Sequence, residues 1–449
     1  MNNYILKNAQ IISMDDNIGD FNNADILVNN DKITSVSKDI HTDSNVDVID
    51  CSNMIIAPGF INTHIHTWQT GLRGVSADWT LSDYLKAVHS GLASYFKPED
   101  IEIANYVGAL HQIHCGTTTL VDWCHNNPTA NHTNSAINGL RRSNIRAIFL
   151  HGSPKHPPKE GQKHFSEIPM PKSEIVRLRK DEFNSNDDLL SLGLAVLGPQ
   201  QSIMAVCEED FRLANDLDLF ISMHIGGQFL TPNGFDDLNK LNLLSSKTNI
   251  VHANRITDDM LNMLIEANVT FSLTPEVELQ MGFGNPLTKR LIEHNGRMAF
   301  GSDIESAMAA DMFSVIRTSL QAVRHEITLE SYEKTNKPPD KMSVSSRNAL
   351  EWATINAASI LSMDNIIGSI SPGKKADLIM FKKDEINFMP THDPIASILF
   401  HSGPRDIDSV IINGSFVKRN GNLIDKKLPS LLEKLNESGK RIVHDFLAR

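Results

Sequence analysis

The stretch that decides the fold is Ala57-Pro58-Gly59-Phe60-Ile61-Asn62-Thr63-His64-Ile65-His66, an apolar run that ends in two histidines. In a β-strand, residues i and i+2 point to the same face, so both imidazoles can reach one metal ion. A chain with 18 histidines among 449 residues contains about 0.7 such pairs by chance. The pair therefore indicates a metal site only if other parts of the chain supply further ligands.

The middle of the chain alternates short apolar runs with helical segments, which is typical of a parallel α/β architecture. Eight runs are candidate strands, and eight strands close a (β/α)8 TIM barrel. They cover residues 55–61, 117–122, 146–150, 190–196, 219–223, 249–251, 269–273 and 297–300. Segments 73–97 and 152–173 are long and polar, and we expect both to lie over the mouth of the barrel.

Both ends of the chain have the character of antiparallel strands. Residues 4–6, 9–12 and 24–28 alternate in the β manner, and residues 29–32 are typical of a hairpin turn. Near the other end, Asn413-Gly414 is a strong hairpin signal between two apolar runs. We therefore expect a small β-sandwich from residues 1–56 and 362–426, a barrel over 57–361 and a C-terminal helix over 427–449.

Single metal-capable residues follow three more of the predicted strands. His224 follows the run 219–223, His252 follows 249–251, and Asp303 comes shortly after 297–300. Each alone is more often structural than a ligand. Because active sites of such barrels lie at the carboxyl ends of the strands, these residues and His64 and His66 are expected to converge. Imidazole and carboxylate donors favour Zn²⁺, with Fe²⁺ and Mn²⁺ as alternatives.

Composition excludes several classes of function. The formal net charge is 42 − 54 = −12, and an acidic chain lacks the basic footprint that a nucleic-acid partner requires. No apolar run is long enough to span a membrane, and the first residues do not resemble a signal peptide. The four cysteines form no CxxC pair. We therefore expect a cytoplasmic protein without a nucleic-acid or membrane partner, and a small-molecule substrate is compatible with this composition.

Several motifs resemble the amidohydrolase superfamily, in particular its cytosine-deaminase-like and triazine-hydrolase-like (chlorohydrolase/deaminase) branch. The likeness covers nearly the whole chain. Its motifs are residues 58–66, the following Trp68-Gln69-Thr70-Gly71-Leu72-Arg73-Gly74, Gly116-Thr117-Thr118-Thr119-Leu120-Val121-Asp122, Gly301-Ser302-Asp303, and residues 367–378, which include Pro372-Gly373-Lys374-Lys375-Ala376-Asp377.

The resemblance implies that His64, His66, His224 and Asp303 bind one divalent metal ion, and that His252 contacts the attacking water or the substrate. It also implies hydrolysis of a non-peptide carbon–nitrogen bond in a small heterocyclic substrate, with deamination foremost, and a homo-oligomer. The fourth strand, 190–196, contains no lysine, which favours a mononuclear site. Asp303 is expected to take the proton of the attacking water, as a catalytic residue besides a ligand.

Two positions depart from this branch. The glutamate expected three residues after His224 is replaced by Gly227, and Gln228 cannot act as an acid or base. The histidine usual at the end of strand 7 is replaced by Leu273, and Glu276 and Glu278 follow it. We expect either of these glutamates to be the relocated catalytic acid. The alternatives are a pair stabilised at a helix N-terminus, or proton transfer by Asp303 alone.

Five other side chains are candidates for substrate binding. These are Trp68, Gln69, His125, His151 and Gln228. The aromatic ring suits a flat substrate, and the polar groups would orient it. Other functions stay open on the same scaffold: release of a halide or an alkylamine, opening of a cyclic amide, or, last, a metal-binding protein without activity.

Overall fold

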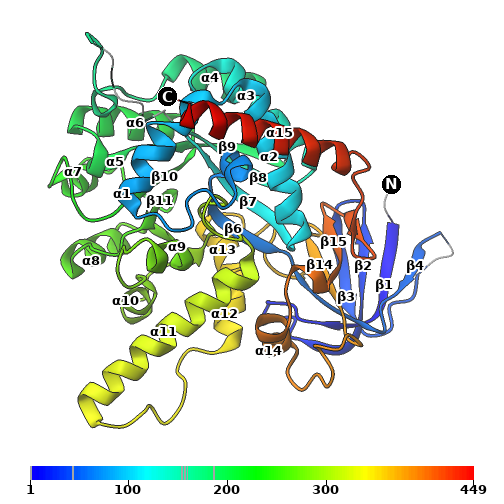
Figure 1. Ribbon diagram of the computed structural model, residues 1–449. Coiled ribbons are helices and arrows are strands. Elements are labelled where there is room, and N and C mark those ends of the chain that lie inside the picture. The colour runs from blue at the N-terminus through cyan, green and yellow to red at the C-terminus, as the bar shows by residue number, and fades with distance from the viewer. Residues whose placement is uncertain are drawn as a thin grey trace.

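Two sheets make up the computed structural model, which describes residues 3–42, 45–152, 155, 158, 160–185 and 188–448. The described residues leave out the two ends of the chain, residues 1–2 and 449, and part of the segment 152–173 that we expect over the barrel mouth. Figure 1 shows the sheet of the terminal segments to one side of the barrel and its surrounding helices. Among the described helices, none combines the length and the apolarity needed to cross a bilayer.

The barrel is an eight-stranded parallel sheet with its strands in chain order. Its strands are β6 (Phe60–Ile65), β7 (Thr117–Cys124), β8 (Arg146–Gly152), β9 (Leu190–Ala195), β10 (Phe220–Ile225), β11 (Thr248–His252), β12 (Thr270–Leu273) and β13 (Met298–Phe300). A parallel bridge between Ile65 and Asp303 joins the first strand to the residues after the last. The predicted TIM barrel is confirmed, and its closure brings the HxH strand next to Asp303.

Helices cover the outside of the barrel between successive strands (Figure 1). The principal ones are α2 (Pro98–His114), α3 (Ala130–Ser143), α4 (Lys172–Asp181), α6 (Met204–Asp216), α8 (Asp258–Glu266), α10 (Thr288–Glu293) and α11 (Met312–Thr335). Because helices and barrel interior enclose both faces of the strands, β7 and β8 are buried along their whole length. The strands are consequently apolar runs rather than alternating ones.

The first expected barrel strand, 55–61, is two strands in the structure. β5 (Met54–Pro58) pairs with β14 (Leu378–Lys382) in the terminal sheet, and β6 begins only at Phe60. Gly59 separates them at a point of close approach, where a Cβ would lie 2.1 Å from Thr118 Oγ1. The prediction was wrong here because one continuous apolar run passes from one sheet into the other.

The terminal sheet has nine strands contributed by both ends of the chain. The remaining strands are β1 (Asn3–Ile11), β2 (Phe21–Asn29), β3 (Lys32–Ser37), β4 (Asp47–Asp50), β15 (Ile407–Ile412), β16 (Ser415–Arg419) and β17 (Asn422–Leu423). Both expected hairpins are present: Asn29 pairs with Lys32, and Ile412 pairs with Ser415. Asn413 and Gly414 have φ values of 51° and 74°, as the tight hairpin turn requires.

A buried ion pair joins the two sheets. Arg146 begins β8, and its guanidinium contacts both carboxylate oxygens of Asp377, with Nε–Oδ2 at 2.8 Å. Asp377 Oδ1 also accepts a hydrogen bond of 2.7 Å from the backbone N–H of Asn413. Both charged side chains are only 3% exposed. The pair fixes the terminal sheet against the barrel.

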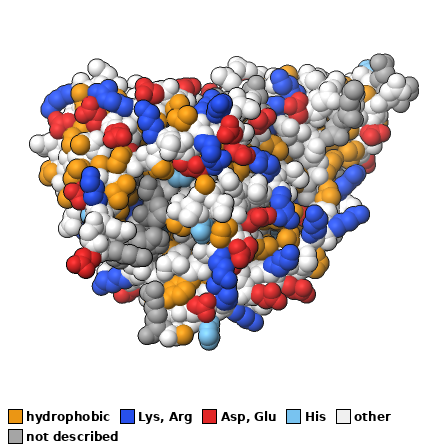
Figure 2. Space-filling view, turned by 90° about the horizontal axis from the view of Figure 1, so that it is seen from above, with side chains coloured by type: hydrophobic (Ala, Val, Ile, Leu, Met, Phe, Trp, Pro, Cys, Tyr) orange, Lys and Arg blue, Asp and Glu red, His pale blue; other side chains and the backbone are white. Residues whose placement is uncertain are grey.

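The last helix, α15 (Leu428–Leu447), runs back across the barrel helices, in red in Figure 1. Its Ser438 and Arg441 both contact Asp100, near the start of α2. On the face shown in Figure 2, acidic and basic side chains are interspersed without an extended basic patch.

Candidate active site

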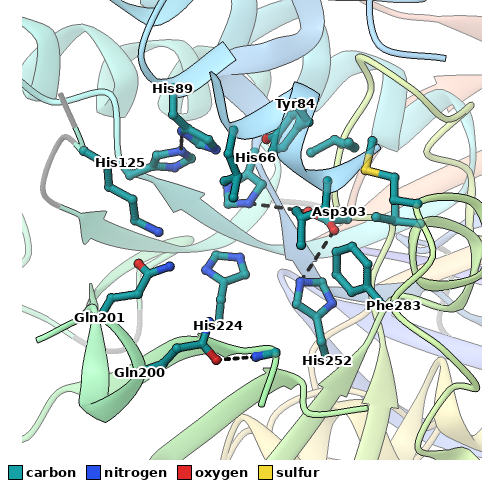
Figure 3. A pocket seen from close by; sticks show the side chains of 17 residues that line it. His66, Tyr84, His89, His125, Gln200, Gln201, His224, His252, Phe283 and Asp303 are labelled. Carbon is teal, nitrogen blue, oxygen red and sulfur yellow. Dashed lines mark hydrogen bonds and ion pairs between the residues drawn. The ribbon is translucent and has the colours of Figure 1, made fainter. Parts of the chain in front are cut away.

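Four predicted ligands meet at the carboxyl end of the barrel. One ligand atom from each of His64, His66, His224 and Asp303 lies within 4.8 Å of the others. His64 Nε2 is 3.2 Å from His224 Nε2 and 3.4 Å from Asp303 Oδ1, and His66 Nε2 is also 3.4 Å from Asp303 Oδ1. Figure 3 shows three of these side chains, His66, His224 and Asp303, converging from different strands.

Burial keeps these imidazoles neutral. It lowers the pKa of His66 to about 3, together with the nearby charge of His64, and it also lowers the pKa values of His64 and His224. For Asp303, burial acts to raise the pKa, but hydrogen bonding to His64 and the surrounding histidines hold it below its usual range. Neutral imidazole nitrogens facing one another beside a carboxylate are the donor set of a divalent cation, so the residues fit a metal ion.

Neighbouring groups orient the ligands. His66 Nδ1 lies 2.6 Å from the backbone carbonyl of Trp123, which leaves Nε2 for the metal ion. The amide of Asn62 donates to Ser302 Oγ at 2.7 Å, and its oxygen accepts from the backbone N–H groups of His64 and Ser302. Asn62 therefore connects the HxH strand to the segment that carries Asp303.

Two site residues have unusual backbone conformations. His252 and Asp303 lie in the left-handed region, with φ values of 71° and 63°. Residues other than glycine adopt this region at a cost of order 1–3 kcal/mol, and such residues are concentrated at functional sites. The fold holds both side chains in place through this strained backbone, at the last residue of β11 and three residues beyond the end of β13.

Three of the ligands, His66, His224 and Asp303, line a pocket at the mouth of the barrel. Part of its wall is apolar and is made by Leu81, Leu85, Val277, Met281, Phe283 and Ile304. Its polar lining includes Tyr84, His89, His125, Lys155, Gln200 and Gln201 (Figure 3). A flat, mostly apolar ring with a few polar substituents matches this lining.

The predicted substrate-binding residues divide into two groups. His125 lines the pocket, and its Nε2 is 2.7 Å from His89 Nδ1. Trp68, Gln69, His151 and Gln228 are not among the lining residues. Trp68 and Gln69 are fully buried within the 3-10 helix that follows His66 (Thr67–Leu72), whereas Gln228 is exposed.

Gln69 contacts the pocket indirectly. Its amide nitrogen donates to the Tyr84 hydroxyl at 2.5 Å, and its oxygen accepts from Ser306 Oγ at 2.8 Å. Gln69 thus fixes Tyr84, which does line the pocket. His151 is likewise buried beside Thr133, with Nε2 3.4 Å from Thr133 Oγ1.

The two candidate glutamates lie at the start of the short helix α9 (Pro275–Gln280), and neither lines the pocket. Glu276 Oε1 accepts a hydrogen bond of 2.5 Å from Ser314 Oγ, at the first turn of α11. Glu278 is fully buried behind His252, with Oε1 3.3 Å from His252 Nδ1. Glu278 therefore reaches the site only through the imidazole.

The backbone explains why no acid follows His224 at the usual position. Gly227 has a φ of 122°, and a Cβ there would lie 2.6 Å from the Cβ of Arg255. The Gln200 side chain caps this loop, since its Oε1 accepts hydrogen bonds from the backbone N–H groups of Gly226 and Gly227. Its amide nitrogen is left to serve as a donor at the pocket wall.

Sequence reasoning missed several pocket residues. Gln200 follows the predicted strand 190–196 closely, so the rule that located His224 could also have found it. His89 belongs to the segment expected over the barrel mouth, but no local pattern singled it out. Lys155 lies 5.5 Å from the Trp123 ring, and burial lowers the pKa of its ammonium group to about 8.

The model of the amidohydrolase family matches residues 55–417, and the chain belongs to this family. A protein from Methanobrevibacter smithii named 5'-deoxyadenosine deaminase is 26% identical over 433 residues, 92% of this chain and 94% of that protein. One from Syntrophomonas wolfei, named 5-methylthioadenosine/S-adenosylhomocysteine deaminase, is 25% identical over 88% of this chain and 89% of its own length.

Solved structures have the same fold. A zinc-bound adenosine deaminase from Xanthomonas campestris has a TM-score of 0.81 at 20% identity, over 98% of both chains. The atrazine chlorohydrolase of Arthrobacter aurescens TC1, complexed with zinc, has a TM-score of 0.84 at 20% identity, over 97% of this chain and all of that one. The predicted family and the predicted class of enzyme, a metal-dependent amidohydrolase, are confirmed.

Proposed function

We propose that this protein is an aminohydrolase that removes an exocyclic amino group from a flat heterocyclic substrate. The observation that carries the proposal is the convergence of His64, His66, His224 and Asp303 within 4.8 Å of one another, with the last three lining the pocket. The deaminase names of the two relatives support it. Purine-like rings, with or without a ribose, are the first substrates to test.

The four ligands would hold one divalent metal ion, for which we propose zinc. A bound ion supplies Lewis acidity, which makes water a nucleophile near neutral pH. The two carboxylate oxygens of Asp303 have different neighbours. Oδ1 points to the histidine ligands, and Oδ2 lies 3.9 Å from His252 Nε2. Asp303 Oδ2 is therefore the group that takes the proton of the attacking water, and His252 stands beside the reacting carbon.

The pocket wall orients the substrate. The apolar side chains accommodate the ring faces, and water is excluded as the ring fills the pocket. The Gln200 amide, whose oxygen is occupied by backbone N–H groups, donates to a ring nitrogen or carbonyl. Lys155 adds a positive charge to this wall. We further propose a cytoplasmic homo-oligomer; the four cysteines, all buried and unpaired, are compatible with a reducing compartment.

One observation favours a second candidate function. No side chain fits at Gly227, where the acid that protonates a leaving amine is expected. A halide leaves without a proton, so displacement of chloride from a triazine-like ring would not require that acid. Hydrolysis of an alkylamine or of a cyclic amide still needs a proton donor and is ranked lower.

The test is a substrate screen of the purified protein loaded with Zn²⁺, Fe²⁺ or Mn²⁺. Aminopurines, their nucleosides, aminopyrimidines, pterins and aminotriazines are assayed for ammonia release, with Asp303→Asn as the matched inactive control. We expect stoichiometric ammonia from at least one class. Chloride release from a chlorotriazine without any ammonia would move the assignment to the second candidate, and no product from any substrate would refute both.

A further inference from the structure

Glu278 is a completely buried carboxylate beside the active site that the mechanism above does not use. It is 0% exposed and does not line the pocket. Its Oε1 accepts a hydrogen bond of 2.8 Å from the backbone N–H of Thr274. Its Oε2 accepts one of 3.2 Å from the side-chain amide of Asn254. Both partners are donors, so they fix the orientation of the carboxylate.

Two further groups contact this carboxylate: the Thr274 hydroxyl, which donates to Oε1 at 3.4 Å, and the imidazole of His252. Nδ1 of the imidazole is 3.3 Å from Glu278 Oε1 and 3.0 Å from Thr274 Oγ1. A carboxylate accepts hydrogen bonds only, so its contact with Nδ1 is a hydrogen bond when Nδ1 carries the proton. The ring is also confined by Phe283, whose plane is nearly perpendicular to it at a centroid distance of 4.9 Å. Glu278 therefore favours the tautomer of His252 that is protonated at Nδ1.

The opposite side of the imidazole faces the reaction. His252 lines the pocket, and Nε2 is directed toward Asp303 Oδ2 at 3.9 Å (Figure 3). Glu278, His252 and Asp303 thus follow one another in the order carboxylate, imidazole, proton-transfer group. In this arrangement the imidazole takes up a proton at one nitrogen, and the buried carboxylate stabilises the resulting cation. Separations in a ligand-free site are commonly longer than in the reacting complex.

We propose that Glu278 is a positioning residue that makes His252 the proton relay in place of the acid absent at Gly227. Water adds to the substrate carbon, a C–O bond forms, and its proton goes to Asp303 Oδ2. That proton passes to His252 Nε2 and then to the amino nitrogen, the C–N bond breaks with its electron pair on nitrogen, and ammonia leaves. When the C–O bond forms, the π pair of the ring C=N bond moves onto the ring nitrogen, and it returns to that bond as ammonia leaves. The remaining hydroxyl proton then moves to the ring nitrogen, which gives the carbonyl form. This relay rests on the proposed function.

The competing explanation is structural: Glu278 merely satisfies the first turn of α9 through Thr274. That role predicts loss of stability without a specific effect on turnover. The proposed role predicts loss of turnover whenever the carboxylate charge behind His252 is removed, even if the shape is kept.

The decisive variant is Glu278→Gln in the metal-loaded enzyme, because it keeps the shape and the acceptor for Thr274. We expect kcat to fall about 10²-fold, with KM within threefold of wild type. Glu293→Gln, a carboxylate-to-amide change on the neighbouring helix α10 at an exposed ion pair with Lys289, is the matched control and should leave kcat unchanged. Asn254→Ala should lower the melting temperature with a much smaller loss of kcat, because the charge remains.

A second measurement does not depend on turnover. Nitrogen-15 NMR of histidine-labelled wild type should show His252 protonated at Nδ1. Retention of kcat within threefold in Glu278→Gln, or a neutral His252 protonated only at Nε2, would overturn the proposal. Failure of wild type to release ammonia from any substrate would instead overturn the proposed function, and the tautomer measurement would still test Glu278.

Discussion

The ion pair between Arg146 and Asp377 yields a quantitative prediction for stability. Asp377→Ala leaves the guanidinium of Arg146 buried without its carboxylate and removes the acceptor of the Asn413 backbone N–H. Removing one partner of a buried ion pair costs about 3–5 kcal/mol. Both side chains are 3% exposed, so water cannot compensate without opening the contact between the two sheets.

The expected shift in melting temperature follows from the size of the chain. An unfolding entropy of about 2.1 cal/mol/K per residue gives about 0.9 kcal/mol/K for 449 residues unfolding as one unit. A loss of about 4 kcal/mol then lowers the melting temperature by about 4 °C. Differential scanning calorimetry of the metal-loaded protein measures this shift, and activity at 25 °C should be nearly unchanged because the pair is not among the pocket residues.

The controls separate burial from charge. Glu208→Ala breaks an exposed i,i+4 pair with Arg212 and should shift the melting temperature by less than about 1 °C. Replacing both partners, as in Arg146→Met with Asp377→Leu, should recover much of the loss, because no uncompensated charge is left buried. A melting temperature of Asp377→Ala within 1 °C of wild type would refute the reasoning.

Three further predictions concern the site and the core. Chelation of the metal ion should abolish activity. It should also lower the melting temperature by about 3 °C relative to protein with zinc at 100 times its Kd, because binding at that concentration contributes about 2.7 kcal/mol. Added zinc should restore both activity and melting temperature in wild type but not in His224→Ala. Tyr84→Phe should raise KM about fivefold with little change in kcat, as expected for one lost hydrogen bond; an unchanged KM would show that the hydroxyl does not meet the substrate. Burial raises the pKa of Asp210 to about 7, above an unfolded value of about 3.9, so its contribution to stability is complete below about pH 4 and is lost as pH rises through about 7. Asp210→Asn should flatten this part of the stability profile in urea titrations, and a profile parallel to that of wild type would contradict the assignment.

The sequence predicted the site most accurately where a metal-capable residue follows a predicted barrel strand. His224, His252 and Asp303 each follow a buried apolar run, and the parallel barrel brings the ends of such runs together. The division between β5 and β6 was not predictable from the pattern, because Met54–Ile65 is apolar on both sides of Gly59 and both sheets bury their strands.

The pocket wall was harder to predict for a different reason. Gln69 and Tyr84 are 15 positions apart, and only tertiary packing decides that the first is buried and the second faces the substrate. Glu278 was predicted from the sequence as one of two candidates for the relocated acid. Its sequence position does not reveal whether it faces the metal ligands or the far side of His252. Its hydrogen bonds to Thr274 and Asn254 answer that question.

The lack of space for a side chain at Gly227 limits which substitutions this position can accept. Substitution of Gly227 by glutamate would place a side chain against Arg255 on a backbone with φ of 122°, so a single substitution does not introduce an acid at this position. The loop and Arg255 would have to change first, without benefit to activity. Variant libraries designed to accept new leaving groups should therefore vary residues 226–228 together with residue 255. A substitution at 227 alone is expected to be lost because it impairs folding.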